Sequence, residues 1–348
     1  MKQVFYVAIV LLLCIGFAQA EEVPFVKLKG HSGVVCHAVF SPDGKKVMTG
    51  GTGFPSPTAE SVRIWDVRSG KELQKFKGVH YADFSPDGRK IAISEPQHRL
   101  VRIRDAESGK ELQKLEGYSP IFLDNEKIIT TVITPGRGGI RIWNIESGKE
   151  LQIFKGIFSA YPSPNGKIIA THTNDRILSV WDVESGAELL KLEAAPTRSF
   201  FSPDGKRIAA TDYNVKYFYS FVTEPFQSTF RILDVESGNT LHKLEGTCGI
   251  FSPNGKKIAS AGIEGNVKIW DVESGEELHK LKADSVLAFS TDGKIITTDD
   301  GNTRIWNAES GKELQTLEGY PLALSPDGKR VVTGYGSDGT ARIWTLEP

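Results

Sequence analysis

Seven histidines are the side chains best suited to acid–base or metal chemistry, and they are scattered along the chain. They are His31, His37, His80, His98, His172, His242 and His279. No pair has the spacing of a metal site, and the sequence contains no His-Glu-x-x-His motif. His242 and His279 stand where repeated segments elsewhere carry glutamine, so we interpret both as surface residues of a strand. The histidines therefore predict neither a metal centre nor a catalytic pair.

Three further motifs would indicate chemistry. Residues 299–302, Asp-Asp-Gly-Asn, share features with a calcium loop but lack its remaining ligands, so they are interpreted as a turn. A Gly-x-Ser-x-Gly elbow and a phosphate-binding glycine loop are both missing from the sequence. We therefore expect no catalytic residue, no metal and no cofactor, and we predict that the protein is not an enzyme.

Binding residues are instead expected in three irregular segments, 50–60, 134–139 and 213–226. Six of the 14 residues in 213–226 are aromatic. Exposed aromatic and arginine side chains concentrate binding energy at interfaces. The alternative is that 213–226 folds over its neighbour and buries its own rings. The candidate binding residues are Phe54, Pro55, Arg137, Tyr213, Tyr217, Phe218, Tyr219, Phe221 and Phe226.

Short recurring motifs reveal the elements that must position these segments. Ser-Pro-Asp-Gly or a close variant occurs seven times, and a decayed copy at Leu123 makes eight. A tryptophan preceded by Ile or Val follows six copies, while Arg104 and Leu233 hold its position in the other two. These positions are 36–39 residues apart, except for one interval of 52 in the fifth copy. The chain is therefore predicted to be eight repeats with one insertion.

Each repeat is predicted to form four short strands. An apolar stretch precedes Ser-Pro-Asp-Gly and a β-branched run follows it. A strand alternating with period two then carries the tryptophan, as in 267–270, and Glu-Leu-x-Lys-Leu alternates again. Pro, Asp and Gly in this order are typical of a type I turn. No sustained helical period occurs, so an all-β fold is expected.

These paired motifs resemble WD40 repeats over residues 24–348. The resemblance implies a closed β-propeller with one four-stranded blade per repeat. Eight blades are expected, with seven as the alternative if one degenerate repeat is not a blade. The family's Gly-His survives only at Gly30-His31, so its His–Ser/Thr–Asp–Trp network can be complete in at most one blade. His31 is accordingly interpreted as a structural residue.

The two ends of the chain predict how the ring closes. Val23 to Lys29 resembles only the last strand of a repeat, and the final repeat stops after its third strand. The N-terminal strand is therefore expected to complete the last blade and cover a free edge. Cys36 and Cys248 would then lie three blades apart, too far for a disulfide, so two free and mostly buried thiols are expected.

Residues 1–20 have the features of a signal peptide. Lys2 supplies a charge, 4–17 are uncharged and apolar, and Ala18-Gln19-Ala20 is typical of a cleavage site. The apolar run is shorter than the ~20 residues of a membrane-spanning helix, which disfavours an anchor. The mature chain is predicted to be 21–348 without an integral membrane segment, and to be exported to the periplasm, cell envelope or extracellular space.

Charge and repeat symmetry limit the function. A formal net charge of −1 excludes a strongly basic nucleic-acid-binding protein. In an antiparallel blade the nearly identical turns fall on one face and the divergent connections on the other, which favours the second face for binding. We expect a monomeric scaffold that binds a protein partner, as the WD40 resemblance implies. The alternatives are a surface binder of carbohydrate or a small ligand, and a quinoprotein-like propeller enzyme.

Overall fold

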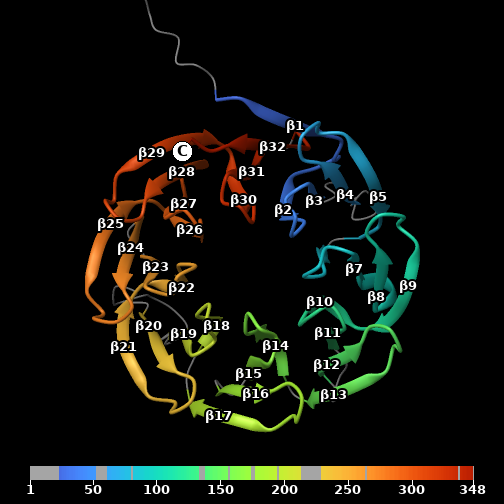
Figure 1. Ribbon diagram of the computed structural model, residues 1–348, viewed down its shortest axis with the longest axis horizontal. Helices are drawn as coiled ribbons and strands as arrows, with labels where there is room; N and C mark the ends of the chain where they lie inside the picture. The colour runs from blue at the N-terminus through green and yellow to red at the C-terminus, as the bar shows by residue number, and fades with distance from the viewer. Residues whose placement is uncertain are drawn as a thin grey trace, which may run out of the picture.

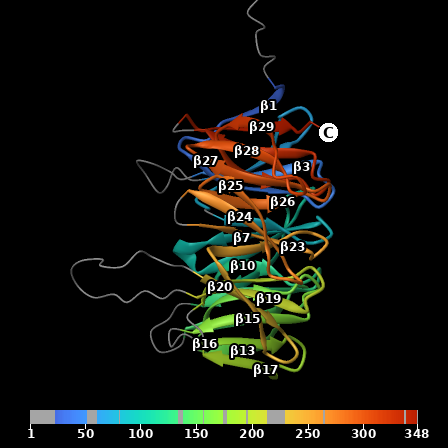
Figure 2. The same ribbon diagram turned by 90° about the vertical axis from the view of Figure 1, so that its left-hand side faces the viewer.

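Eight four-stranded antiparallel sheets stand around a central axis in the computed structural model (Figure 1). The structure describes residues 23–51, 61–79, 81–132, 138–155, 157–173, 177–193, 196–212, 229–262, 265–335 and 338–347. Seen from the side, the sheets form a disc (Figure 2). The prediction of a closed, nearly all-β propeller with eight blades is confirmed, and the degenerate second and third repeats are full blades.

The strands of the first four blades follow chain order from the axis outward. Blade 1 contains β2 (Val35–Phe40), β3 (Lys46–Gly51), β4 (Ser61–Asp66) and β5 (Glu72–Lys77). Blade 2 contains β6 (Tyr81–Phe84), β7 (Lys90–Glu95), β8 (Leu100–Asp105) and β9 (Glu111–Glu116), with a 3-10 turn, η2 (Pro96–His98). Blade 3 contains β10 (Tyr118–Phe122), β11 (Lys127–Val132), β12 (Gly139–Asn144) and β13 (Glu150–Lys155). Blade 4 contains β14 (Ile157–Pro162), β15 (Ile168–Thr173), β16 (Ile177–Asp182) and β17 (Glu188–Glu193).

Three of the remaining blades have the same order, and the last one combines both ends of the chain. Blade 5 contains β18 (Pro196–Phe201), β19 (Arg207–Asp212), β20 (Thr229–Asp234) and β21 (Thr240–Glu245). Blade 6 contains β22 (Thr247–Phe251), β23 (Lys257–Ala261), β24 (Asn266–Asp271) and β25 (Glu277–Lys282). Blade 7 contains β26 (Ser285–Phe289), β27 (Lys294–Asp299), β28 (Asn302–Asn307) and β29 (Glu313–Glu318). Blade 8 contains β30 (Tyr320–Leu324), β31 (Arg330–Tyr335), β32 (Thr340–Thr345) and β1 (Phe25–Lys29).

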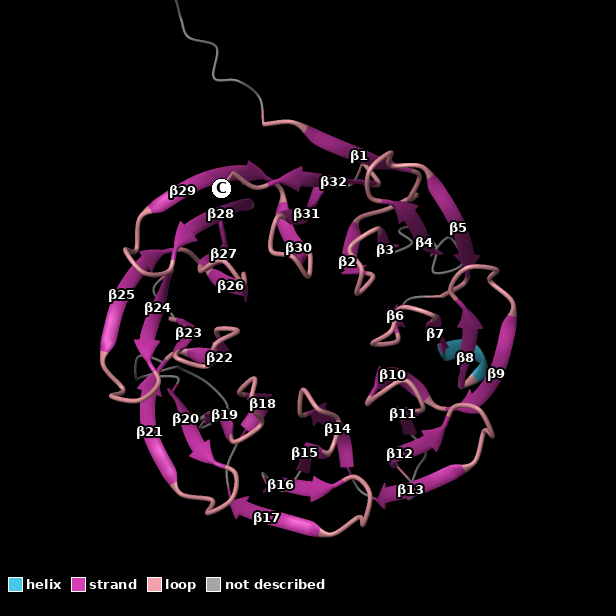
Figure 3. Ribbon diagram, viewed as in Figure 1, coloured by secondary structure: helices cyan, strands magenta, loops and turns pink. Residues whose placement is uncertain are grey.

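Strand β1 closes the ring by pairing antiparallel with β32 (Figure 3). The register runs from Phe25 opposite Trp344 to Lys29 opposite Thr340. Leu28 is fully buried in the core between blades 8 and 1. The ring of Phe25 packs against that of Trp344, with their centroids 4.7 Å apart. The strand therefore contributes apolar packing to this blade in addition to backbone hydrogen bonds.

The hydrophobic cores lie between adjacent blades. One of them joins Val267 and Ile269 of blade 6 to Phe289, Ile295 and Trp306 of blade 7. The third strand supplies both of its faces to such cores, which explains why the sequence keeps apolar residues there. Blade-to-blade burial of apolar area thus stabilises the disc.

Ser-Pro-Asp-Gly forms the same turn in the blades that keep it. In blade 1, Ser41 Oγ donates to Asp43 Oδ1 at 2.6 Å and accepts from the Lys46 amide at 2.9 Å. Gly44 has a φ of +67°, a conformation that glycine adopts without a Cβ clash. The motif therefore reflects turn geometry and needs no ligand to explain it.

The expectation of mostly buried thiols is wrong for Cys36, whose side chain is exposed. The register between β2 and β3 shifts between Val35 and His37, so Cys36 is an extra residue in the innermost strand. A bulge of this kind removes a side chain from the regular inward alternation. The side chain of Cys248 lies outside the described residues.

Candidate interaction surface

Antiparallel order divides the disc into two faces. The first and third connections of each blade form one face, called here the turn face. The second connections and the links between blades form the opposite one, called the loop face. The long segments start after Gly51, Val132 and Asp212 and therefore leave the loop face at blades 1, 3 and 5.

All nine predicted binding residues lie outside the described residues: Phe54, Pro55, Arg137, Tyr213, Tyr217, Phe218, Tyr219, Phe221 and Phe226. The structure does fix where their segments are attached. The segment of blade 5 begins after β19 and returns at Thr229 in β20. The attachment points of all three segments thus share one face of the ring.

The turn face is tied together from blade to blade. Lys257 of blade 6 donates to the Ala308 carbonyl at 3.0 Å and forms an ion pair with Glu309 at 2.5 Å, both in blade 7. His279 Nε2 of blade 6 donates to the Glu309 carbonyl at 2.7 Å. The same kind of bond joins blade 1 to blade 2, because the Gln74 side chain of blade 1 donates to the Ala106 carbonyl of blade 2 at 3.1 Å. These polar residues of the turn face therefore hold neighbouring blades together.

This contact refines the interpretation of two histidines. His242 and His279 lie on the outermost strands, as the sequence predicts. His242 Nε2 also donates to the Glu273 carbonyl of the next blade at 3.0 Å. The sequence analysis did not predict this bond between blades. It could have been inferred from the repeat position, which holds either histidine or glutamine, since both side chains can donate to a carbonyl.

A second set of contacts links the third strands to the preceding blades. Lys268 pairs with Glu245 of blade 5 at 2.7 Å and with Glu277 of its own blade at 2.9 Å. The hydrogen bond to Glu245, followed by that to Glu277, raises the pKa of Lys268. The ammonium also lies 5.2 Å from the Trp270 ring centroid, a cation–π contact. Arg141 makes the corresponding pair with Glu116 of blade 2 at 2.6 Å.

His31 is part of a buried hydrogen-bond network in blade 1. Its Nε2 lies 2.7 Å from Thr49 Oγ1, which also accepts a bond from Trp65 Nε1 at 2.7 Å. Burial, and then the charges of Arg63 and Lys75, lower the pKa of His31 to about 4. The structural interpretation of His31 is thus confirmed, and the imidazole is neutral near pH 7.

Among the described residues, no group of three or more His, Cys, Asp or Glu side chains could hold a metal ion. Residues 300–301 form a turn, as predicted. Asp299 pairs with Arg304 at 2.6 Å, and the Asp300 amide donates to Asp284 at 3.1 Å. These carboxylates therefore serve the local fold of blade 7.

Asp83 is a residue that sequence reasoning missed. It lies in the innermost strand of blade 2, at the repeat position held by Val39 and Ile121 in the flanking blades. Burial raises the pKa of its carboxyl to about 6, and within the described part of the chain no basic side chain forms an ion pair with it. The signal was an aspartate at an apolar repeat position.

The model of the WD domain, G-beta repeat family matches residues 22–66, 238–271, 275–307 and 311–345. Each stretch runs from the outermost strand of one blade through the third strand of the next. The chain carries WD40 repeats, and with its eight-bladed propeller these support a WD40-repeat propeller family. Its repeat is therefore offset from the blade, so that every WD40 unit joins two neighbouring blades.

Structural comparison agrees with this assignment. The WD40 propeller is similar to the crystal structure of the computationally designed Ika8 protein, with a TM-score of 0.72. The match covers 93% of this chain and 100% of that chain at 20% sequence identity, which shows a shared fold. No curated protein matches the sequence. The described part of the WD40 chain has no helix long and apolar enough to cross a membrane.

Proposed function

We propose that this WD40 propeller is an exported scaffold that binds a protein partner on its loop face. The difference between the two faces carries the proposal. The turn face repeats the same residues in blade after blade, and its polar groups bond within their turns or to the next blade. Three long, dissimilar segments leave the opposite face at blades 1, 3 and 5.

A scaffold role agrees with the state of the histidines. His31, His172 and His279 are hydrogen-bonded to Thr49, Ser199 and the Glu309 carbonyl respectively. The hydroxyls of Thr49 and Ser199 are fully buried inside the blades, which closes both His–hydroxyl pairs to a substrate. The described residues thus support binding without catalysis.

Export rests on the sequence of residues 1–20, which lie outside the described residues. A charged start, an apolar run and Ala-Gln-Ala together favour cleavage after Ala20. The partner is accordingly a protein of the periplasm, the cell envelope or the extracellular space.

Carbohydrate binding is the second candidate, because segment 213–226 carries six aromatic residues that could stack on sugar rings. The test crosslinks immobilised residues 21–348 in an envelope extract and screens the same protein against a glycan array. A variant with Tyr217, Phe218, Tyr219 and Phe221 changed to Ser is the control.

We expect the parent chain to capture a protein that the control variant captures in much smaller amount. Saturable glycan binding with no depleted protein would overturn the scaffold proposal in favour of the second candidate.

A further inference from the structure

Blades 7 and 8 depart from the other repeats in their innermost strands. In β26, Val286 pairs with Thr297 and Ala288 with Ile296, so Leu287 is an extra, bulged residue. In β30, the shift between Pro321 and Ala323 makes Leu322 the bulged residue. The other six blades place a small residue or proline before a larger one. Their pairs are Ala38–Val39, Ala82–Asp83, Pro120–Ile121, Ala160–Tyr161, Ser199–Phe200 and Gly249–Ile250.

These bulges change what the two strands present to their neighbours. Leu287 packs against the core between blades 7 and 8, and Leu322 packs against the core between blades 8 and 1. The residues that follow them, Ala288 and Ala323, are small. Leu324 then stands where blades 7 and 1 have Phe289 and Phe40, so blade 8 lacks a ring at this level.

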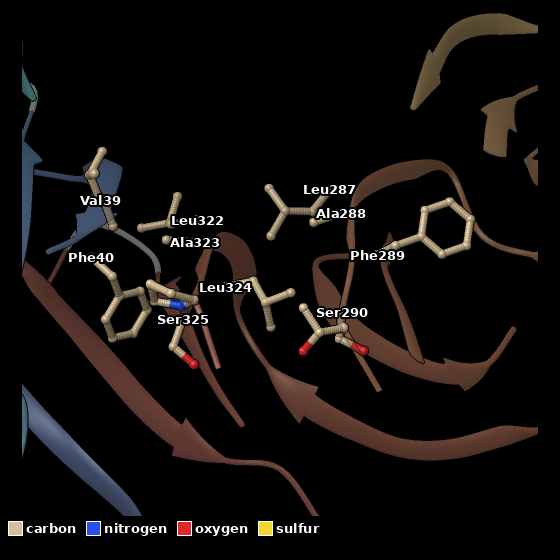
Figure 4. A pocket seen from close by; sticks show the side chains of 13 residues that line it. Val39, Phe40, Leu287, Ala288, Phe289, Ser290, Leu322, Ala323, Leu324 and Ser325 are labelled. Atoms are coloured by element: carbon tan, nitrogen blue, oxygen red, sulfur yellow. The ribbon is translucent and has the colours of Figure 1, made fainter. Parts of the chain in front are cut away.

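Together these changes leave a pocket of about 440 Å³ at the innermost strands β26, β30 and β2. We call it the blade 8 pocket. Val39, Leu287 and Leu322 extend to its open side, whereas Phe40 and Phe289 point away from it (Figure 4). Register shifts also interrupt the innermost strands of blades 1, 3, 4, 5 and 6, so what sets blades 7 and 8 apart is the leucine at the shift and the alanine that follows it.

The lining of the blade 8 pocket determines what it could hold. None of its 13 lining residues carries a charge. Ser325 Oγ donates to Asp327 and accepts from the Arg330 amide at 2.8 Å, so its hydrogen-bonding capacity serves its own turn. Ser290 bonds in the same way to Asp292 and Lys294. The lining therefore offers a charged ligand no counter-charge to offset the hydration that it gives up on binding.

We propose that the blade 8 pocket binds a small uncharged molecule with an aliphatic body. Its volume lies within the range of about 300–1,000 Å³ that is usual for small-molecule sites. Its wall combines Leu287, Leu322, Leu324 and Val39, which favour aliphatic over polar groups. The site is separate from the loop-face segments and does not depend on their partner.

The probe for this site is octan-1-ol, with sodium octanoate as its charged counterpart. Isothermal titration calorimetry of residues 21–348 should show saturable binding of one octan-1-ol, with octanoate at least ten-fold weaker. Intermolecular NOEs from the alcohol to the methyl groups of Leu287 and Leu322 should locate it. Absence of saturable binding, equal affinity for octanoate, or NOEs to other residues alone would overturn the proposal.

Ala323→Phe fills the pocket and should lower the affinity for octan-1-ol at least ten-fold. Ile250→Phe is the matched control, because Ile250 holds the same repeat position in blade 6 and does not line the pocket. It should leave the affinity unchanged. Equal losses in both variants would contradict the assignment. If Ala323→Phe does not fold, Ala288→Val provides a smaller filling change, and the NOEs decide the outcome without any variant.

Discussion

The indole Nε1 of Trp65 donates a 2.7 Å hydrogen bond to Thr49 Oγ1, and a tryptophan–hydroxyl bond recurs in every blade that keeps the tryptophan, with Ser260 as the acceptor in blade 6. Where Arg104 replaces tryptophan in blade 2, the hydroxyl position is Ile93. Where Leu233 replaces it in blade 5, that position is Ala210. Donor and acceptor are thus absent together in these two blades; a buried hydroxyl without a partner would cost about 1–3 kcal/mol.

Trp270→Ala should therefore lower the free energy of unfolding by about 3–5 kcal/mol, since it empties a large aromatic site and leaves Ser260 without its donor. Arg104→Ala should cost far less. Its side chain is 26% exposed and makes a bond to the Gly109 carbonyl and a contact with Phe76. Urea unfolding of both variants measures the difference. Equal losses of unfolding free energy would show that the position of a residue in the repeat does not predict its burial.

His31 should make stability depend on pH. Its pKa is about 4 in the folded chain against 6.5 as the ordinary value, so the unfolded chain binds more protons between these values. The stability contributed by neutral His31 is present above about pH 6.5 and lost as pH falls towards 4, by up to about 3 kcal/mol. His31→Gln should flatten the unfolding profile in this window. Parallel profiles for the parent and the variant would contradict the network.

Asp83 should make stability depend on pH in the direction opposite to His31. Burial raises its pKa from 3.8 to about 6, so the folded chain binds more protons and stability falls as pH rises between these values. Asp83→Asn should be more stable than the parent at pH 7, by at most about 3 kcal/mol, and nearly equal to it below pH 4. Thermal unfolding at both pH values tests this. A less stable variant at pH 7 would mean that a cation compensates the carboxylate.

Removal of residues 21–30 should open blade 8. The deletion takes away β1, exposes the edge of β32 and removes the buried Leu28. Aggregation or a large fall in Tm is expected, because a free strand edge pairs with other chains. Leu28→Ala keeps the backbone pairing and should cost about 2–5 kcal/mol. Melting of the truncated protein at the parent Tm would disprove closure by this strand.

The sequence determined the fold because each repeat carries its own turns and its own alternating strands. Ser41, Asp43 and Gly44 specify a turn locally, and the apolar face of Val267 and Ile269 specifies a buried strand. The bulges at Leu287 and Leu322 were not predictable in this way, because the register of a strand is set by its pairing with the next strand of the blade and not by its own residues alone. Cys36 was misjudged for the same reason.

The candidate site was predictable only as a location. Antiparallel order requires the second connections to lie opposite the repeated turns, which places the long segments on one face. The residues of these segments, such as Tyr217 and Phe221, follow no repeated pattern from which a conformation could be predicted. Asp83 could have been noticed from the sequence, since every other blade has an uncharged residue at that position.

The central claim is that the loop face recognises the partner and the turn face does not. The decisive measurement is the Kd of the captured partner for two variants. One changes Tyr217, Phe218, Tyr219 and Phe221 to Ser. The other changes the exposed Lys71, Lys149 and Lys312 of three repeated turns to Glu. We predict a loss of at least ten-fold in the first, about 1.4 kcal/mol, and little change in the second. A folded first variant with unchanged Kd, together with a weakened second variant, would contradict the account and assign recognition to the turn face.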